Sequence, residues 1–212
     1  AGIVGEDGPT HHGAFDIAYL RSVPNMTIAS PRNEHWLRKL MCTAAADGHG
    51  PIAIRYPRGK GRMTDNWECA LEPVAIGRGE RLRDGHEACV LTIGPVADEA
   101  ASAIDSLAVR GHSIAHYDMV FAKPLDETIM REVAEKGLPV ITVEDGIASG
   151  GMGSAVVEWL ADHGYTLPVR RVGLPDAFVT QGSPSELAAL CGTDAAGIER
   201  AIAETLKLHP EE

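Results

Sequence analysis

Aromatic residues are scarce in this sequence, and its cysteines are few and scattered. Phe, Trp and Tyr make up 5% of the 212 residues, whereas apolar residues as a whole reach 44%. The core must therefore consist mainly of Ala, Val, Leu and Ile, which suits a layered α/β fold. Cys42, Cys69, Cys89 and Cys191 form no Cys-x-x-Cys motif. We therefore expect neither a zinc site nor a disulfide framework, but the reduced thiols of a cytoplasmic protein.

Excess positive charge and long apolar runs are absent as well. The formal net charge of -11 argues against non-specific binding to nucleic acid or to an anionic membrane. No apolar run approaches the roughly 20 residues of a membrane span, and no signal peptide is visible. We therefore expect no nucleic-acid or membrane partner. An anionic substrate remains compatible with this charge, because it needs only a local arginine site.

One stretch near the N-terminus is rich in residues with special conformations and chemistry. Residues 5–16 read Gly-Glu-Asp-Gly-Pro-Thr-His-His-Gly-Ala-Phe-Asp and follow the apolar run 1–4, which we predict to be a strand. Glycine costs backbone entropy and proline removes a hydrogen-bond donor, so these residues in the loop lower stability in return for a defined backbone shape. A loop at the end of a strand is where α/β folds place their chemistry. The helical pattern that follows has its apolar positions at Phe15, Ala18, Tyr19 and Val23.

Inside this loop lie one carboxylate, Asp7, and two imidazoles, His11 and His12. Asp-Gly-Pro is ordinary turn chemistry, so a solvated turn is the alternative interpretation. Because Asp7 and His11 lie four positions apart, the carboxylate could orient the His11 ring. Neighbouring His side chains rarely converge on one ion and no further ligand cluster is evident, so we predict no metal site.

A second candidate loop, residues 55–61, follows a strand predicted at 52–54 and reads Arg-Tyr-Pro-Arg-Gly-Lys-Gly. A guanidinium offers a planar fork of donors and glycine lets the backbone approach an anion, so the loop is a candidate phosphate site. A solvated basic loop is the alternative. Because Pro57 favours an extended backbone before it, Arg55 and Arg58 should face opposite ways. We therefore do not assign both arginines to one phosphate.

Taken in order, these motifs resemble the thiamine-diphosphate enzymes of the transketolase group, and within that group the 1-deoxy-D-xylulose-5-phosphate synthases. The resemblance covers essentially the whole chain. It rests on residues 5–16, 19–25, 50–51, 55–59, 143–146, 173–179 and 181–182.

The resemblance implies a function and a role for three residues. These enzymes condense pyruvate with D-glyceraldehyde 3-phosphate, with loss of CO2, as the first step of non-mevalonate isoprenoid synthesis. They use thiamine diphosphate and Mg2+ and act as homodimers. By this resemblance, His11 transfers protons and contacts the substrate hydroxyl, Asp7 is its neighbour and a substrate hydrogen-bonding partner, and Arg58 binds the substrate phosphate.

The sequence departs from the family in one large respect. It contains no Gly-Asp-Gly, the family's diphosphate and magnesium motif, and the family's activating glutamate lies upstream of the opening motif. We therefore expect no cofactor-binding or metal-binding residue in this chain. Because the chain opens at Ala1 inside an apolar stretch, we expect that it needs the N-terminal portion of the same enzyme as a partner and is inactive alone. A non-catalytic interaction module and the β subunit of a related 2-oxo acid dehydrogenase are the alternatives.

The pattern predicts two α/β units. Residues 1–62 should be the end of a pyrimidine-binding domain, with a strand at 26–29 and a helix from about 30 to 46, for which Asn33 is a candidate cap. Residues 63–78 should be a linker, and residues 79–212 a transketolase C-terminal-like domain with a mostly parallel sheet. Its hairpin edge is expected at 79–85. Its strands are expected at 88–94, where the apolar run is nearly continuous, and at 113–117, 138–143 and 167–172. Its helices are expected at 96–109, 126–136, 152–163, 185–190 and 194–206.

A glycine-rich turn is predicted at 144–153. It follows a strand and opens a helix, as in dinucleotide-binding motifs, but Val156 stands where the third glycine should be. Glu144 and Asp145 would also repel a phosphate there. We predict a structural turn or a contact between domains or subunits.

Overall fold

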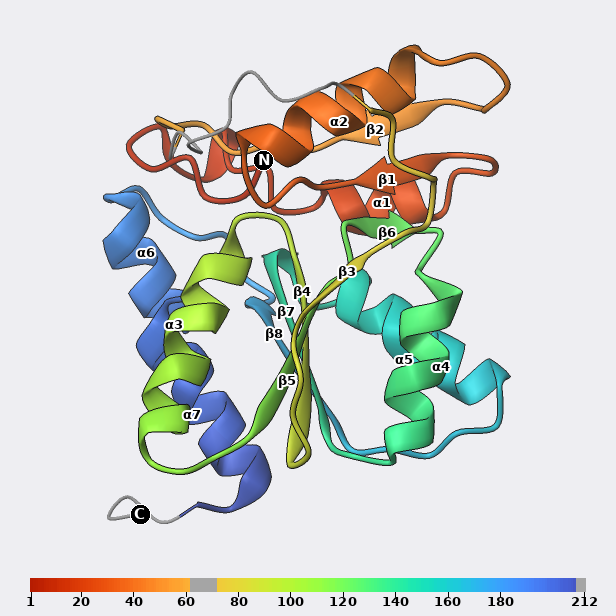
Figure 1. Cartoon of the computed structure of the whole chain (residues 1–212). Coiled ribbons are helices and arrows are strands. Elements are labelled where there is room, and N and C mark those ends of the chain that lie inside the picture. The colour runs from red at the N-terminus through yellow and green to blue at the C-terminus, as the bar shows by residue number, and fades with distance from the viewer. Residues whose placement is uncertain (62–71, 209–212) are drawn as a thin grey trace.

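The computed structural model describes residues 1–61 and 72–208, which form two stacked α/β units (Figure 1). A three-stranded sheet of order β2-β1-β6 belongs to the upper layer, and a five-stranded sheet of order β3-β5-β4-β7-β8 forms the lower one. The α/β class is therefore confirmed. The first part of the predicted linker, residues 63–71, lies outside the described residues.

The upper layer contains the two loops that carry the candidate residues. Within it, β1 pairs in parallel with β2 and antiparallel with β6. Asn33 caps α2 by accepting a hydrogen bond from the Trp36 amide, as the sequence predicted. The elements are η1 (Gly8–Thr10), α1 (Asp16–Arg21), β1 (Thr27–Ala29), α2 (Glu34–Ala45), β2 (Ile52–Ile54) and β6 (Phe121–Lys123).

Two predictions for the N-terminal region were wrong. The run 1–4 is not a strand, because Gly2 adopts a positive φ of 68° and forms only an isolated bridge with Gly13. The predicted apolar face of the following helix is also wrong, since Ile17 is its buried residue while Tyr19 is 60% exposed. The helix begins only at Asp16 and spans six residues, so a pattern extended to Val23 misplaced its inner face.

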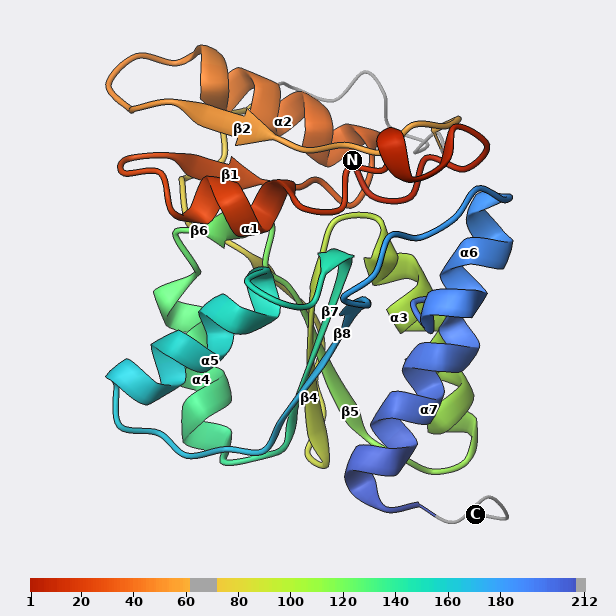
Figure 2. The ribbon, with the colours of Figure 1, turned by 180° about the vertical axis from the view of Figure 1, so that it is seen from behind.

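The lower layer confirms the mostly parallel sheet. Strands β5, β4, β7 and β8 are parallel, and β3 pairs antiparallel with β5 at the edge. Helices α3 and α7 cover one face of the sheet, and α4 and α5 cover the other (Figure 2). The strands are β3 (Glu80–Arg83), β4 (Ala88–Ile93), β5 (Ile114–Asp118), β7 (Val140–Ile147) and β8 (Val169–Leu174); the helices are α3 (Val96–Val109), α4 (Glu127–Lys136), α5 (Met152–Asp162), α6 (Pro184–Cys191) and α7 (Ala195–Leu206).

Two further predictions, both about strands of the lower layer, were wrong. β3 is an edge strand as expected, but it pairs with β5 rather than with its sequence neighbour, so there is no hairpin at 79–85. β7 continues to Ile147, so residues 144–147 belong to a strand and only the residues after it form the turn. β6 was not predicted, because three residues ending at the cis Lys123–Pro124 bond carry no periodic signal.

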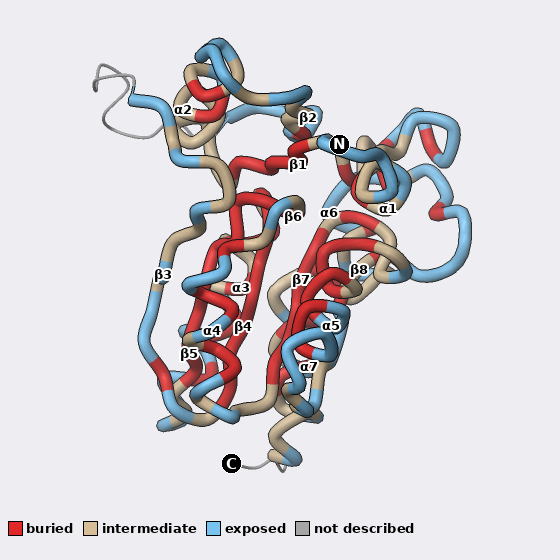
Figure 3. Tube along the Cα trace, turned by 90° about the vertical axis from the view of Figure 1, so that its right-hand side faces the viewer, coloured by how far each residue is buried: buried red, intermediate tan, exposed pale blue. Residues whose placement is uncertain are grey.

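The buried residues concentrate along β4, β5 and β7 (Figure 3). All six residues of β4 are buried, which confirms the strand predicted from its continuous apolar run. The core between this sheet and helices α4 and α5 also includes Ile17 and Ile28 from the upper layer. This hydrophobic cluster therefore contains residues of both layers, and their relative position is fixed by packing as well as by polar contacts.

Two titratable groups are buried where β5 approaches the upper layer. His116 is 2% exposed, and its Nε2 lies 3.0 Å from the Thr92 hydroxyl oxygen. Burial lowers the pKa of His116 to about 4, with Arg32 and Arg83 acting in the same direction. Burial raises the pKa of Asp118 to about 7. Both shifts arise because charged forms are disfavoured away from water.

The lowered pKa of His116 predicts a pH-dependent contribution to stability. Between pH 4 and 6.5 the folded chain binds fewer protons at this ring than the unfolded chain, so stability increases with pH in that interval. The free energy of unfolding of the native chain, minus that of H116Q, should rise by about 3 kcal/mol over that interval. Urea unfolding of both proteins at several pH values measures this difference. A constant difference would contradict the assignment.

Candidate functional site

The first part of the site is the motif loop, residues 5–13, which folds as a tight turn. The Gly8 amide donates to the Gly5 carbonyl at 3.1 Å, and the His11 amide donates to the Gly8 carbonyl at 3.0 Å. The base of the loop is closed by a pair of hydrogen bonds between Gly2 and Gly13, at 3.0 and 2.9 Å. Gly8 has a φ of 66°, a conformation that favours glycine. The backbone therefore forms a compact loop on which Asp7 and His11 are exposed.

Asp7 and Arg58 meet although they lie 51 positions apart in the sequence. The Asp7 carboxylate and the Arg58 guanidinium form an ion pair, so the loop after β2 contacts the motif loop. Both side chains are accessible, with 42% of Asp7 and 60% of Arg58 exposed. The guanidinium is therefore held at one nitrogen by Asp7 while much of it faces solvent.

His11 lies on the same loop and is exposed. Its Nδ1 is 3.0 Å from the Thr10 hydroxyl oxygen, and that hydroxyl donates to the Asp7 carbonyl at 3.4 Å. The side-chain partner of the His11 ring is thus Thr10, whereas the Asp7 carboxylate that we expected to orient it contacts Arg58. The turn η1 lies between the two residues and directs Asp7 toward the 55–61 loop. Asp7 thus contacts Arg58 directly, and His11 is linked to the Asp7 backbone through the Thr10 hydroxyl.

Arg55 occupies a different environment from Arg58, as the sequence predicted. It is 6% exposed, and its Nε donates to Asp16 at 2.9 Å while a second nitrogen pairs with Asp145 of β7. Its third nitrogen donates to the Gly13 carbonyl at 3.1 Å. Burial alone would lower the pKa of Arg55, but the two carboxylates more than offset it and hold that pKa above its ordinary value. Arg55 therefore has a structural role, because its contacts support the base of the motif loop.

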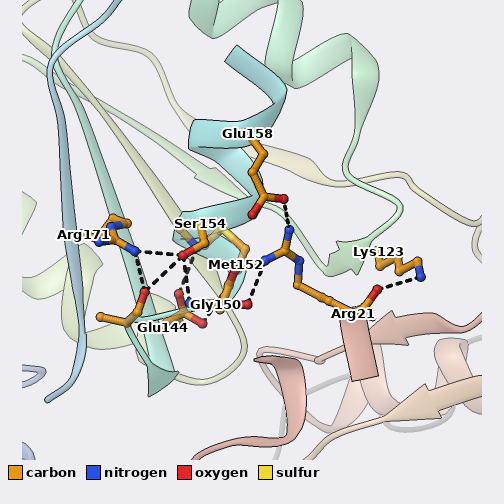
Figure 4. A network of polar contacts seen from close by, with 11 residues as sticks. Arg21, Lys123, Glu144, Gly150, Met152, Ser154, Glu158 and Arg171 are labelled. Atoms are coloured by element: carbon orange, nitrogen blue, oxygen red, sulfur yellow. Dashed lines mark hydrogen bonds and ion pairs between the residues drawn. The ribbon is translucent and has the colours of Figure 1, made fainter. Parts of the chain in front are cut away.

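The glycine-rich segment after β7 is a contact between the two layers (Figure 4). Arg21 of α1 donates to the Gly150 carbonyl at 2.7 Å and to the Gly151 carbonyl at 3.0 Å, and it pairs with Glu158. Lys123 in turn donates to the Arg21 carbonyl at 2.9 Å. A contact of this kind was one of the alternatives predicted for the turn, although the segment begins later than expected.

The N-terminus of α5 is already occupied by a side chain of the same protein. Buried Glu144 accepts hydrogen bonds from the Met152 and Gly153 amides, each at 2.9 Å. A Cβ at Gly151 would lie 2.1 Å from this carboxylate, so glycine is required there. Burial raises the pKa of Glu144, and the two amide bonds act in the opposite direction. This helix start therefore does not offer its amides to a nucleotide phosphate.

A cavity of about 290 Å³ lies beside the 55–61 loop. Its lining includes Pro57 and Gly59, on either side of Arg58, but not Arg58 itself. Sequence reasoning missed this cavity because its other walls come from the starts of α2 and α3, which no local pattern connects. The remaining lining residues are Pro31, Arg32, Asn33, Glu34, Leu37, Tyr56, Lys60, Gly61, Pro95 and Asp98.

The donor groups of the described residues do not fit a metal site. Across residues 1–61 and 72–208, no group of three or more His, Cys, Asp or Glu side chains is arranged to hold a metal ion. Asp7 is already paired with Arg58.

Among the helices of the same ranges, none combines the length and apolar character needed to cross a membrane.

Two family models match this chain in sequence order. Residues 1–64 match the pyrimidine binding domain of transketolase, and residues 77–198 match the transketolase C-terminal domain. The first match contains the upper layer without β6, and the second contains β6 and most of the lower layer.

Curated relatives with similar sequences carry one name. A 1-deoxy-D-xylulose-5-phosphate synthase of Bacteroides fragilis is 54% identical over 203 residues, which is 95% of this chain and 31% of that protein. The same-named protein of Bacteroides thetaiotaomicron is 51% identical over 212 residues, which is 100% of this chain and 33% of that protein. The chain thus spans about a third of the length of the curated relatives it matches.

Solved structures show the same fold. A structure titled "Split gene transketolase, inactive beta4 tetramer" superposes with a TM-score of 0.80 at 28% identity, covering 94% of this chain and 63% of that one. A transketolase from Leishmania mexicana superposes with a TM-score of 0.71 at 21% identity, covering 98% of this chain and 29% of that one.

The contrast between Arg55 and Arg58 yields a prediction for stability. Replacing Arg55 by Met leaves Asp16 and Asp145 without their buried partner, which should cost about 3–5 kcal/mol of unfolding free energy. The same replacement at the exposed Arg58 should cost less than about 1 kcal/mol, so R58M is the matched control. Urea unfolding measures both values, and equal losses would show that the Arg55 network does not stabilise the fold.

Proposed function

This chain belongs to the transketolase family, and on that premise we propose that it is the acceptor-binding part of a 1-deoxy-D-xylulose-5-phosphate synthase. The observation that carries this proposal is the ion pair that brings Arg58 onto the loop presenting Asp7 and His11. The similar synthases of known name support the choice of reaction within the family.

The proposed reaction joins pyruvate to D-glyceraldehyde 3-phosphate, releases CO2 and forms 1-deoxy-D-xylulose 5-phosphate. Thiamine diphosphate, with Mg2+, supplies the carbanion chemistry of such a condensation. The described residues contain no group of three or more His, Cys, Asp or Glu side chains arranged to hold a metal ion. We therefore propose that the N-terminal portion of the enzyme holds both cofactors. The complete enzyme is proposed to be a cytoplasmic homodimer. What this chain contributes is the handling of the aldehyde substrate.

Arg58 is proposed to bind the phosphate of that aldehyde. A guanidinium carries five N–H donors in a planar fork, so one nitrogen can remain on Asp7 while the others reach phosphate oxygens. The 60% exposure of Arg58 leaves those donors accessible. Asp7 is proposed to hold the guanidinium at the loop before the substrate arrives, and to accept a hydrogen bond from the substrate.

His11 is proposed to move the proton at the aldehyde oxygen. An imidazole can donate and accept protons near neutral pH, and this oxygen becomes a hydroxyl when the new carbon–carbon bond forms. The exposed position of His11, on the same loop as the Asp7 carboxylate that pairs with Arg58, supports this role. Binding of the remote phosphate would orient the aldehyde toward the incoming carbanion.

Absence of activity in the isolated chain is part of the proposal. The solved structure at 28% identity is titled as an inactive tetramer of a split-gene transketolase, which supports a folded but inactive subunit. The chain alone, mixed with pyruvate, glyceraldehyde 3-phosphate, thiamine diphosphate and Mg2+, should form no product. Adding the separately expressed N-terminal portion of the enzyme should restore turnover, measured as release of CO2. Product formed by the chain alone would contradict the proposal that the N-terminal portion is needed for activity.

Substitutions in the reconstituted enzyme test the two roles. R58M should raise KM for glyceraldehyde 3-phosphate roughly 10- to 100-fold, because charge-assisted hydrogen bonds to the phosphate are lost, with KM for pyruvate unchanged. H11A should lower kcat by about 100- to 10,000-fold. R170M is a matched control, because Arg170 is an arginine of similar exposure paired with Glu204. Unchanged turnover in H11A would favour a non-catalytic interaction module.

A further inference from the structure

The motif loop lies against a segment of the lower layer that follows β8. We call this the seat segment, residues 177–184. A Cβ at Gly5 would lie 3.2 Å from the Gly182 carbonyl oxygen, and a Cβ at Gly8 would lie 3.3 Å from the Gln181 side chain. The two glycines thus allow the loop backbone to approach the seat segment closely.

Aromatic packing continues this contact beyond the loop. The rings of Phe15 and Phe178 meet edge to face, with centroids 6.0 Å apart and planes at 84°. The Ile147 amide of β7 donates to the Ala14 carbonyl at 2.8 Å. Contacts from the lower layer therefore extend along the chain from Gly5 to Phe15.

The half-buried ring of His12 connects the two segments directly. The Val4 amide donates to Nδ1 of His12 at 3.1 Å, and Nε2 of His12 lies 3.1 Å from the Thr180 carbonyl oxygen. His12 therefore bridges the chain that enters the motif loop and the seat segment.

This geometry fixes the protonation of the ring. A backbone amide only donates, so Nδ1 of His12 must be unprotonated to accept from Val4. A carbonyl only accepts, so Nε2 must carry the proton that is shared with Thr180. Both contacts are satisfied by the neutral ring with its proton on Nε2. A proton on Nδ1 would break the contact with the Val4 amide, and loss of the proton from Nε2 would break the contact with the Thr180 carbonyl.

We propose that His12 is a positioning residue through which the seat segment of the lower layer fixes the motif loop. Its neighbour His11 is exposed to solvent, whereas His12 is turned to the protein. The lower layer then takes part in the site by setting where Asp7 and His11 lie. The consequence for catalysis rests on the proposed function, but the positioning of the loop does not.

The positioning is tested on the isolated chain with three variants. Gln at position 12 can accept through its carbonyl and donate through its amide, whereas Leu is of similar size and can do neither. H12L should accelerate hydrogen exchange of the Val4 amide and the motif-loop amides about 10-fold, as expected for one lost hydrogen bond. H12Q should remain within about threefold of the native rate. H11L is the matched control and should leave the Val4 amide unchanged.

The tautomer provides a second and independent readout. Nitrogen NMR of the native chain should show Nδ1 of His12 as an unprotonated ring nitrogen and Nε2 as a protonated one. Exchange rates in β4 report whether each variant has folded. Native-like Val4 exchange in H12L, or a proton on Nδ1, would overturn the proposal.

Kinetics in the reconstituted enzyme separate this proposal from the proposed function. H12L should lower kcat and raise KM for glyceraldehyde 3-phosphate together, and H12Q should recover most of both. If the reconstituted protein has no synthase activity, the proposed function fails while the exchange and NMR results still decide the role of His12. If it is active and H12L has native kinetics, the positioning proposal is wrong.

Discussion

The buried guanidinium of Arg55 is the interaction on which the arrangement of the site depends. It stands at the end of β2 and contacts Asp16 at the start of α1, Asp145 in β7 and the Gly13 carbonyl at the base of the motif loop. A charge placed there is stable only because each donor has a partner, so removing any one partner affects all the others. Arg55 thereby joins both layers beneath the exposed residues, and rigid support of this kind is what a precise loop requires.

The two layers act as one body for reasons beyond this network. β6 lies in the C-terminal half of the chain, among the elements of the lower layer. It nevertheless completes the sheet of the upper layer by pairing with β1. Arg21 and Lys123 then tie α1 to the turn before α5 and to the strand β6. Since Ile17 and Ile28 also belong to the larger core, separation of the layers would expose apolar surface and leave polar groups unpaired. The boundary between the two predicted domains therefore does not separate parts that move independently.

Sequence patterns predicted the parts of this structure that are determined locally. The continuous apolar run of β4, the Asn33 cap and the opposite environments of Arg55 and Arg58 all follow from rules about neighbouring residues. The partners of Arg55, the short strand β6 and the seat segment were not predictable, because each depends on which distant residues the fold brings together. The contacts of His12 were not predicted for the same reason: Val4 is near in sequence, but Thr180 lies 168 positions away.

The acidic character of the chain is compatible with an anionic substrate because charge acts locally in this site. A net charge of -11 would weaken non-specific attraction of anions, but an ion pair at the loop surface presents a guanidinium that is already oriented. Asp7 holds Arg58 without burying it, so the desolvation cost that a buried pair would impose is small. In the role proposed for it, Arg58 is already in place when a phosphate binds, so little entropy is lost in ordering the guanidinium. That proposal depends on the position of Arg58 relative to Asp7 more than on the total charge of the chain.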